Sequence, residues 1–175
     1  MTNTRKDRIV LIGFRGCGKS TIGKKLAKML GWEYISTDRI IEEKEKMPIN
    51  EIVKRKRWRY FRKLESEVLS EMRASKNLII DTGGGAVIEH QEEIDKLLTS
   101  STVVWIDAYV EDIIRRLKDD KKRPLLNQSN FIEDIEFNYE KRRPVYQNLA
   151  AFKFNTSVES VEQICNKLIL EMRQK

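Results

Sequence analysis

The residues best suited to chemistry lie between Gly13 and Ser20, where the sequence reads G-F-R-G-C-G-K-S. This is the G-x-x-x-x-G-K-[ST] spacing of a phosphate-binding P-loop. Glycines in such a loop let backbone N–H groups point at phosphate oxygens, the lysine reaches the terminal phosphates, and the serine hydroxyl ligates Mg²⁺. The pattern predicts a nucleoside-triphosphate site formed by Gly16, Cys17, Gly18, Lys19, Ser20 and Thr21.

The segments on either side of this loop have the pattern that a P-loop needs. Four apolar residues at 9–12 predict a buried strand, and Ile22, Leu26 and Leu30 predict a helix. This strand–loop–helix order argues against the simpler interpretation, a glycine-rich turn without a ligand. Cys17 lies at a helix N-terminus, which lowers the pKa of a thiol, although we favour its interpretation as a small residue that fills the loop.

Two groups of acidic or small residues follow predicted strands. Asp38 comes directly after a strand predicted at 32–37, where it could orient or deprotonate an attacking hydroxyl group. Taken alone, it would more often be a helix N-cap. Gly83, Gly84 and Gly85 have no side chains, so a ligand could approach their backbone closely. An ordinary turn is the alternative, but a turn does not require three consecutive glycines.

Three arginines could bind anionic groups. Arg62 and Arg142 could each bind a carboxylate through two parallel hydrogen bonds. Arg123 lies in a charged segment that could close over the nucleotide and bring this arginine to the transferring phosphoryl group. Taken singly, each of the three would be interpreted as a solvent-facing residue.

Strands and helices alternate along the chain, which predicts an α/β fold with helices on both faces of a parallel sheet. The predicted strands are 9–12, 32–37, 78–80, 102–106 and 151–154. The later predicted helices are 58–75, 90–99, 110–121, 131–143, which ends before Pro144, and 158–173. Ligands of such sheets bind beyond the carboxyl ends of the strands. The P-loop, Asp38, Asp81 and the three glycines should therefore share one edge.

The composition predicts one domain over residues 1–175, with no apolar run of about 18 residues that could cross a membrane. The N-terminus is polar, so we expect no signal peptide and a cytoplasmic location. The net charge is +7, and the basic segment 54–63 contains aromatic residues that would suit nucleic acid. A solvated helix face is the favoured interpretation. We expect a monomer without nucleic-acid or membrane partners.

Six segments occur in an order that resembles one known family. They are G-F-R-G-C-G-K-S-T at 13–21, S-T-D-R at 36–39, F-R-K-L-E at 61–65, D-T-G-G-G-A-V at 81–87, R-P-L-L at 123–126 and K-R-R-P-V-Y at 141–146. Many families share the P-loop, whereas the order and spacing of the other five segments are much more specific. Over almost its whole length, the chain resembles shikimate kinases.

The resemblance implies a three-layer P-loop kinase fold of the nucleoside-monophosphate-kinase type, with a five-stranded parallel sheet. It implies transfer of the γ-phosphoryl group of ATP to the 3-hydroxyl of shikimate, with Mg²⁺, in aromatic amino-acid biosynthesis. It also implies a helical substrate-binding region at about 37–65 and a mobile lid at about 117–129.

Residue roles follow from the matching motifs. Asp38 corresponds to an acid that contacts the shikimate hydroxyls, and Arg62 and Arg142 to arginines that bind its carboxylate. The middle glycine of the Gly83–Gly85 segment, Gly84, matches a backbone position that contacts the substrate.

The resemblance also implies residues that contact ATP. Arg123 matches the lid arginine that meets the nucleotide, and Arg116 falls where an adenine-stacking arginine often lies, within a weak local motif. Together with Asp38, the expected catalytic residues are Lys19 and Arg123.

Three features depart from the family pattern. Ser36 replaces an aspartate that helps hold the hydration shell of Mg²⁺, and Asp81 stands where the family has a small or apolar residue. We hypothesise that Asp81 supplies the missing acid and forms the metal site with the P-loop serine, since a carboxylate there could bind Mg²⁺-bound water. The alternative is that Asp81 caps the turn. In the substrate region, Arg57-Trp58 replaces a Gly-Glu pair, and Val53 replaces an aromatic residue.

Because the changes in the substrate region affect the choice of acceptor, the sequence defines the reaction type more narrowly than the identity of the acceptor. One alternative is a P-loop kinase for another small acceptor, such as gluconate or a nucleotide. The paired arginines favour an acceptor with a carboxylate, without excluding gluconate. A second alternative is a non-catalytic regulator that binds nucleotide or shikimate and has lost its metal aspartate. A third is a nucleic-acid binder that uses the basic segment.

Overall fold

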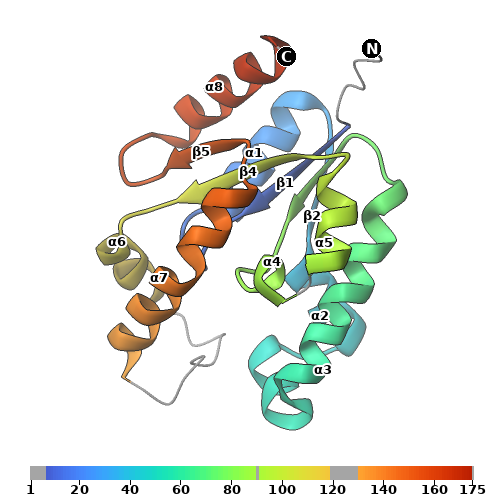
Figure 1. Cartoon of the computed structure of the whole chain (residues 1–175), viewed down its shortest axis with the longest axis vertical. Coiled ribbons are helices and arrows are strands. Elements are labelled where there is room, and N and C mark those ends of the chain that lie inside the picture. The colour runs from blue at the N-terminus through green and yellow to red at the C-terminus, as the bar shows by residue number, and fades with distance from the viewer. Residues whose placement is uncertain (1–6, 90, 119–129, 175) are drawn as a thin grey trace.

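Five parallel strands form one sheet in the computed structural model, which describes residues 7–89, 91–118 and 130–174. The strands are β1 (Arg8–Ile12), β2 (Glu33–Ser36), β3 (Leu78–Asp81), β4 (Thr102–Asp107) and β5 (Phe152–Asn155). Their order in the sheet is β2-β3-β1-β4-β5, with β1 at the centre (Figure 1). This arrangement confirms the predicted fold class and the five-stranded parallel sheet.

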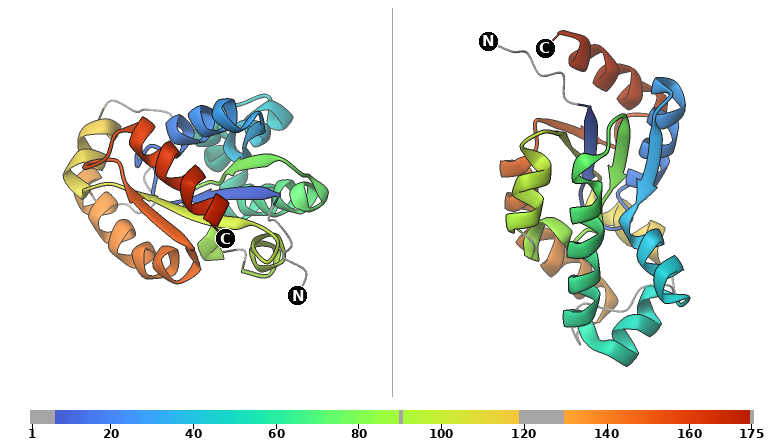
Figure 2. Two further views of the ribbon diagram at one scale, coloured as in Figure 1. Left: turned by 90° about the horizontal axis from the view of Figure 1, so that it is seen from above. Right: turned by 90° about the vertical axis from the view of Figure 1, so that its right-hand side faces the viewer.

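Helices cover both faces of the sheet, as predicted (Figure 2). α1 (Lys19–Leu30) and α8 (Val161–Gln174) pack against each other on one face. The other face carries α4 (Ala86–Glu89), α5 (Gln91–Leu98) and α7 (Phe131–Leu149), and α7 also contacts α6 (Val110–Leu117). Within the described residues, none of the helices has the length and hydropathy needed to span a membrane.

Two helices extend past the carboxyl end of β2 (Figure 1). They are α2 (Thr37–Glu45) and α3 (Ile49–Glu71), which pack against each other, and a 3₁₀ turn at Met72–Ala74 follows them. The sequence predicts separate helices beginning near Ile49 and Trp58. The structure confirms two helical segments: α3 is interrupted at Arg57, whose φ of 69° and ψ of 164° are not helical, and the second segment begins at Trp58.

The central strand determines where the P-loop leaves the sheet. Residues Ile9 to Ile12 of β1 have no exposed surface, as expected for a parallel strand covered on both faces. Leu11 lies opposite Asp81 of the neighbouring strand β3. The chain therefore turns into the P-loop directly beside the end of β3.

The prediction that a helix ends before Pro144 is wrong. α7 continues through this proline to Leu149. Proline removes one N–H donor and crowds the preceding turn, but the turn that follows buries Tyr146 completely and packs Val145 against the core. The burial of these side chains offsets the missing hydrogen bond.

Two other helix boundaries also differ from the predictions. α8 begins at Val161, because the N–H of Gln163 donates to Ser160 Oγ at 3.2 Å and starts the helix there. α6 ends at Leu117, and the predicted helical residues after Lys118 lie outside the described part of the chain.

Candidate active site

The loop between β1 and α1 has the backbone that a P-loop requires. Gly13 and Gly18 have φ values of 139° and 100°, which other residues rarely adopt. A Cβ atom on Gly13 would also collide with the carbonyl oxygen of Ile106. Lys19 Nζ donates to two carbonyl oxygens of the loop, at 2.9 and 3.1 Å, so the ammonium group lies over the loop. Such a loop can bind phosphate oxygens.

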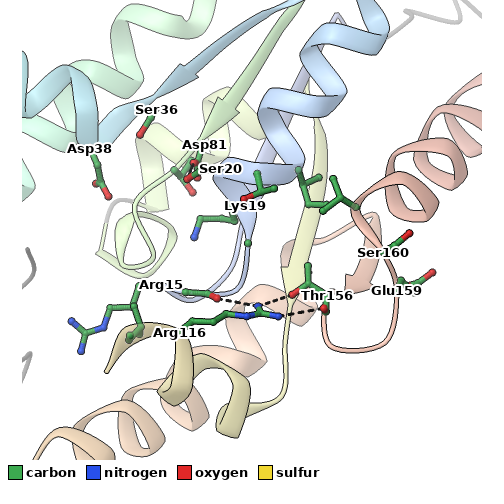
Figure 3. Close-up of a pocket in the computed structure, with 17 residues that line it drawn as sticks. Arg15, Lys19, Ser20, Ser36, Asp38, Asp81, Arg116, Thr156, Glu159 and Ser160 are labelled. Atoms are coloured by element: carbon green, nitrogen blue, oxygen red, sulfur yellow. Dashed lines mark hydrogen bonds between the residues drawn. The ribbon is translucent and has the colours of Figure 1, made fainter. Parts of the chain in front are cut away.

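A cavity of about 740 Å³ opens beside this loop (Figure 3). Its walls come from the P-loop, the ends of β2 and β3, α6 and the segment after β5. The residues predicted from the sequence that line it are Gly16, Gly18, Lys19, Ser20, Thr21, Asp38, Asp81 and Arg116.

Cys17 is buried inside the loop. Burial raises the pKa of its thiol, and this effect outweighs the nearby ammonium of Lys19, which lowers it. The less favoured interpretation of Cys17, a thiol with a pKa lowered by the helix N-terminus, is therefore wrong. A Cβ atom on Gly13 would lie 3.1 Å from Cys17 Sγ, so the side chain fills the loop tightly, which fits the favoured interpretation.

Arg116 connects α6 to the P-loop. Its Nη1 donates to the carbonyl oxygen of Gly16 at 3.1 Å and to Thr156 Oγ1 at 2.9 Å (dashed lines, Figure 3). The hydroxyl of Thr156 in turn donates to the carbonyl oxygen of Cys17 at 2.8 Å. Sequence analysis missed Thr156 and its neighbours Glu159 and Ser160, which line the same cavity. No motif marks them, and only their place after a strand could have indicated them.

Asp81 and Ser20 lie side by side in the cavity (Figure 3). Ser20 Oγ donates to Asp81 Oδ2 at 2.6 Å, and the hydroxyl of Tyr34 donates to the same oxygen at 2.8 Å. Burial, followed by the nearby carboxylate of Asp81, raises the pKa of Tyr34, so its hydroxyl remains a donor. Ser36 lies opposite Asp81 in the pairing of β2 with β3 and lines the same cavity.

These residues fit a magnesium site. In the described part of the chain, no three His, Cys, Asp or Glu side chains form a metal-binding cluster. Mg²⁺ does not require one, because it keeps several water molecules and binds substrate phosphates with one or two carboxylates. A serine hydroxyl and a carboxylate beside a phosphate loop form such a donor set. Within the described residues, the Asp81 side chain bonds to Ser20 and Tyr34 and not to the turn that it was alternatively expected to cap.

A second cavity, of about 40 Å³, brings together the residues predicted to bind the acceptor. It is lined by Asp38, Arg62, Gly83, Gly84, Gly85 and Arg142, together with Arg15, Ile49, Trp58, Phe61 and Glu65. Asp38 and Arg15 line both this pocket and the larger cavity. The alternative that Asp38 is a helix N-cap is wrong: Ser36 is the N-cap of α2, and its Oγ accepts from the N–H of Arg39 at 3.4 Å.

Charged side chains surround the three glycines. Arg62 forms an ion pair with Glu65, whose side chain is 1% exposed. A Cβ atom on Gly83 would meet the carboxylates of Glu65 and Asp38, and one on Gly85 would meet the guanidinium group of Arg62. The glycines therefore leave room for charged groups of the protein itself, a reason that was not visible in the sequence.

α7 supplies one side chain that lines this pocket, Arg142, and a second, Tyr146, that bonds to one of its glycines. Arg142 is buried, with its guanidinium carbon 5.5 Å from the centre of the Phe14 ring. The hydroxyl of Tyr146 donates to the carbonyl oxygen of Gly84. Because α7 continues through Pro144, one helix positions both side chains.

Sequence analysis missed Arg15, which occupies a variable position of the P-loop. It forms an ion pair with the buried Asp134 at 3.2 Å. Trp58 lines the pocket with its ring 5.1 Å from the guanidinium carbon of Arg62, whereas Val53 lines a separate groove on α3. Arg123 and the predicted lid beyond Lys118 lie outside the described residues.

Comparison with known proteins identifies the family. A family model described as shikimate kinase matches residues 15–173. A shikimate kinase of Persephonella marina is 37% identical over 165 residues, which cover 94% of this chain and 98% of the relative. One of Francisella tularensis subsp. holarctica is 40% identical over 166 residues, covering 94% and 93%.

The fold leads to the same family. The solved structure of a shikimate kinase from Acinetobacter baumannii, in complex with shikimate, is 31% identical to this chain. The two superpose with a TM-score of 0.90, over 98% of this chain and 96% of the other. Since sequence and structure both match over almost the full length, this chain belongs to the shikimate kinase family.

Proposed function

We propose that this protein is a shikimate kinase that transfers the γ-phosphoryl group of ATP to the 3-hydroxyl of shikimate. The observation that carries the proposal is the position of Asp38. It lines both the cavity beside the P-loop and the pocket that contains Arg62 and Arg142. A hydroxyl group held against Asp38 would therefore face the phosphates. Membership of the family supports shikimate as the acceptor.

In this mechanism the protein acts by positioning and by stabilising charge. The arginines Arg62 and Arg142 would bind the carboxylate of shikimate. Asp38 would orient the attacking hydroxyl and accept its proton. Lys19 and the N–H groups of the P-loop would stabilise the negative charge on the phosphates.

Mg²⁺ would be held by Ser20 and Asp81. When bound, this ion neutralises part of the charge of the nucleotide phosphates. Arg116, which lines the same cavity, would contact the nucleotide.

The segment 37–65 would form the acceptor-binding region, since it contributes Asp38, Trp58, Arg62 and Glu65 to the smaller pocket. Because Asp38 and Arg15 also line the larger cavity, an acceptor in this pocket could extend toward the P-loop.

The test is release of ADP from MgATP with shikimate, gluconate or no acceptor. We expect turnover with shikimate, accumulation of shikimate 3-phosphate, and little turnover with gluconate. The methyl ester of shikimate, which lacks the carboxylate charge, should bind poorly because Arg62 and Arg142 lose their partner. Preference for gluconate would reject shikimate as the acceptor, and absence of turnover with every acceptor would reject the kinase.

A further inference from the structure

The surroundings of Asp81 differ from those of a carboxylate on the protein surface. Asp81 is 4% exposed, and none of the described residues forms an ion pair with it. A carboxylate removed from water is costly unless a cation or several hydrogen bonds compensate it. Its two side-chain hydrogen bonds come from neutral hydroxyls, those of Ser20 and Tyr34, and both fall on Oδ2. The site therefore has a buried carboxyl group with no ion-pair partner among residues 7–89, 91–118 and 130–174.

Tyr34 is itself fixed in place by α1. A Cβ atom on Gly23 would lie only 2.7 Å from the Tyr34 ring. The ring therefore packs in the space that a side chain at position 23 would otherwise occupy. A glycine inside a helix costs about 1 kcal/mol relative to alanine. Lys24 Nζ also lies 5.9 Å from the centre of the ring. These contacts hold the hydroxyl of Tyr34 against Asp81.

A second residue, Ser36, lies close to the same part of the cavity because of how β2 and β3 are paired. Ser36 and Asp81 are paired across β2 and β3, and each is the last residue of its strand. Neighbouring strands lie about 4.8 Å apart, so a carboxylate at either position can reach the cavity beside Ser20. Only position 81 carries an acid in this chain.

We propose that Asp81 is the protein carboxylate of the magnesium site and that Tyr34 is its positioning residue. The carboxylate is therefore at the end of β3, next to β1. The paired position at the end of β2 is Ser36, which has no carboxylate. This inference rests on the proposed kinase function, because it concerns the cation that accompanies the nucleotide. It adds that a carboxylate at the end of either paired strand, at position 81 or at position 36, should support the metal.

The test moves the carboxylate from β3 to β2. Asp81→Ser, Ser36→Asp and the double variant are compared by Mn²⁺ binding in the presence of ADP, measured from the electron paramagnetic resonance signal of free Mn²⁺. We expect Asp81→Ser to weaken Mn²⁺ binding by about 10-fold to 100-fold, as loss of a group that supports a metal does. The double variant should recover most of the affinity. Asp81→Asn, which keeps the shape of the side chain, replaces Asp81→Ser if the latter does not fold.

Tyr34→Phe tests the positioning role. It should weaken Mn²⁺ binding several-fold at a temperature where the variant is still folded. The metal-free protein should also lose some thermal stability, because one of the two hydrogen bonds to a buried carboxylate is removed. Tyr109→Phe, at an exposed tyrosine, is the matched control and should change neither quantity.

Two results would overturn the inference: wild-type Mn²⁺ affinity in both Asp81 variants, or a double variant no better than Asp81→Ser. Because no acceptor is present, these outcomes are separate from a failure of shikimate turnover. A protein that binds Mn²⁺ and ADP through Asp81 but does not phosphorylate shikimate would reject only the proposed function.

Discussion

At the scale of single residues, Asp38 has the most consequential position. It lies in the first turn of α2, partly buried, and lines both the cavity beside the P-loop and the smaller pocket that we propose for the acceptor. The neighbouring Ser36 caps the helix, so the Asp38 side chain is not used for capping. In the proposed mechanism this side chain contacts a hydroxyl group of the acceptor.

Asp38→Asn should lower kcat by about 100-fold to 10,000-fold, because an amide cannot accept the proton of the attacking hydroxyl. The affinity for ATP should remain within about twofold, since the P-loop is unchanged. Steady-state kinetics and nucleotide titration measure the two quantities. Asp95→Asn, at an exposed position on α5, is the control and should behave as wild type. Turnover of Asp38→Asn close to that of wild type would remove Asp38 from the mechanism.

At the scale of secondary-structure elements, the interruption of α3 at Arg57 shapes the acceptor pocket. The values φ 69° and ψ 164° lie in a region that essentially only glycine adopts. The chain turns there so that Trp58 and Arg62, on the following segment, face the pocket. An arginine at this position costs conformational free energy that the fold must offset elsewhere.

Arg57→Gly should raise the free energy of unfolding by about 1 kcal/mol. Relief of a strain of about 1–3 kcal/mol exceeds the cost of a more flexible unfolded chain, about 0.4–1 kcal/mol. Arg59→Gly is the matched control: it lies in the same helix with a similar exposure, and should destabilise by about 1 kcal/mol. Denaturant unfolding compares them. A loss of stability in Arg57→Gly would show that the kink is not strained.

At the scale of the whole molecule, three tyrosines tie distant elements together. Tyr34 bonds to the end of β3, Tyr139 donates to Asp107 Oδ1 at 3.0 Å, and Tyr146 bonds to Gly84. Burial raises the pKa of all three above the ordinary tyrosine value. In the folded protein these hydroxyls therefore stay protonated to a higher pH than in the unfolded chain.

Stability should consequently fall as the pH rises above about 10. Below that pH, these tyrosines are protonated in both the folded and the unfolded chain. Above it they ionise first in the unfolded chain, which then binds fewer protons, so the free energy of unfolding decreases with pH. The slope is about 1.4 kcal/mol per pH unit for each tyrosine that stays protonated in the folded protein.

Tyr146→Phe isolates this contribution from the lysines that also titrate at high pH. Its unfolding free energy should be lower than that of wild type at neutral pH, because the bond to Gly84 is lost. It should then fall less steeply between pH 10 and 12. Denaturant titrations at several pH values provide the measurement, and equal slopes for the two proteins would contradict the prediction.

The fold and much of the candidate site could be predicted from local patterns. The apolar run of β1, the P-loop spacing and the alternation of strands and helices are each contained in a few consecutive residues. They place Lys19, Asp38 and Asp81 at one edge of a sheet before any distance is known. This local reasoning failed at Pro144, because the burial of Tyr146 and Val145 outweighs the preference of the proline.

The sequence by itself thus determined the fold class, the P-loop and the resemblance to the shikimate kinase family. Only the tertiary structure decided that Arg15 and Asp38 line both cavities, that Thr156 joins Arg116 to the loop, and that Tyr34 holds Asp81. The physical reason is distance along the chain. A motif records residues that are neighbours in sequence, whereas these contacts join segments that meet only when the parallel strands are placed side by side.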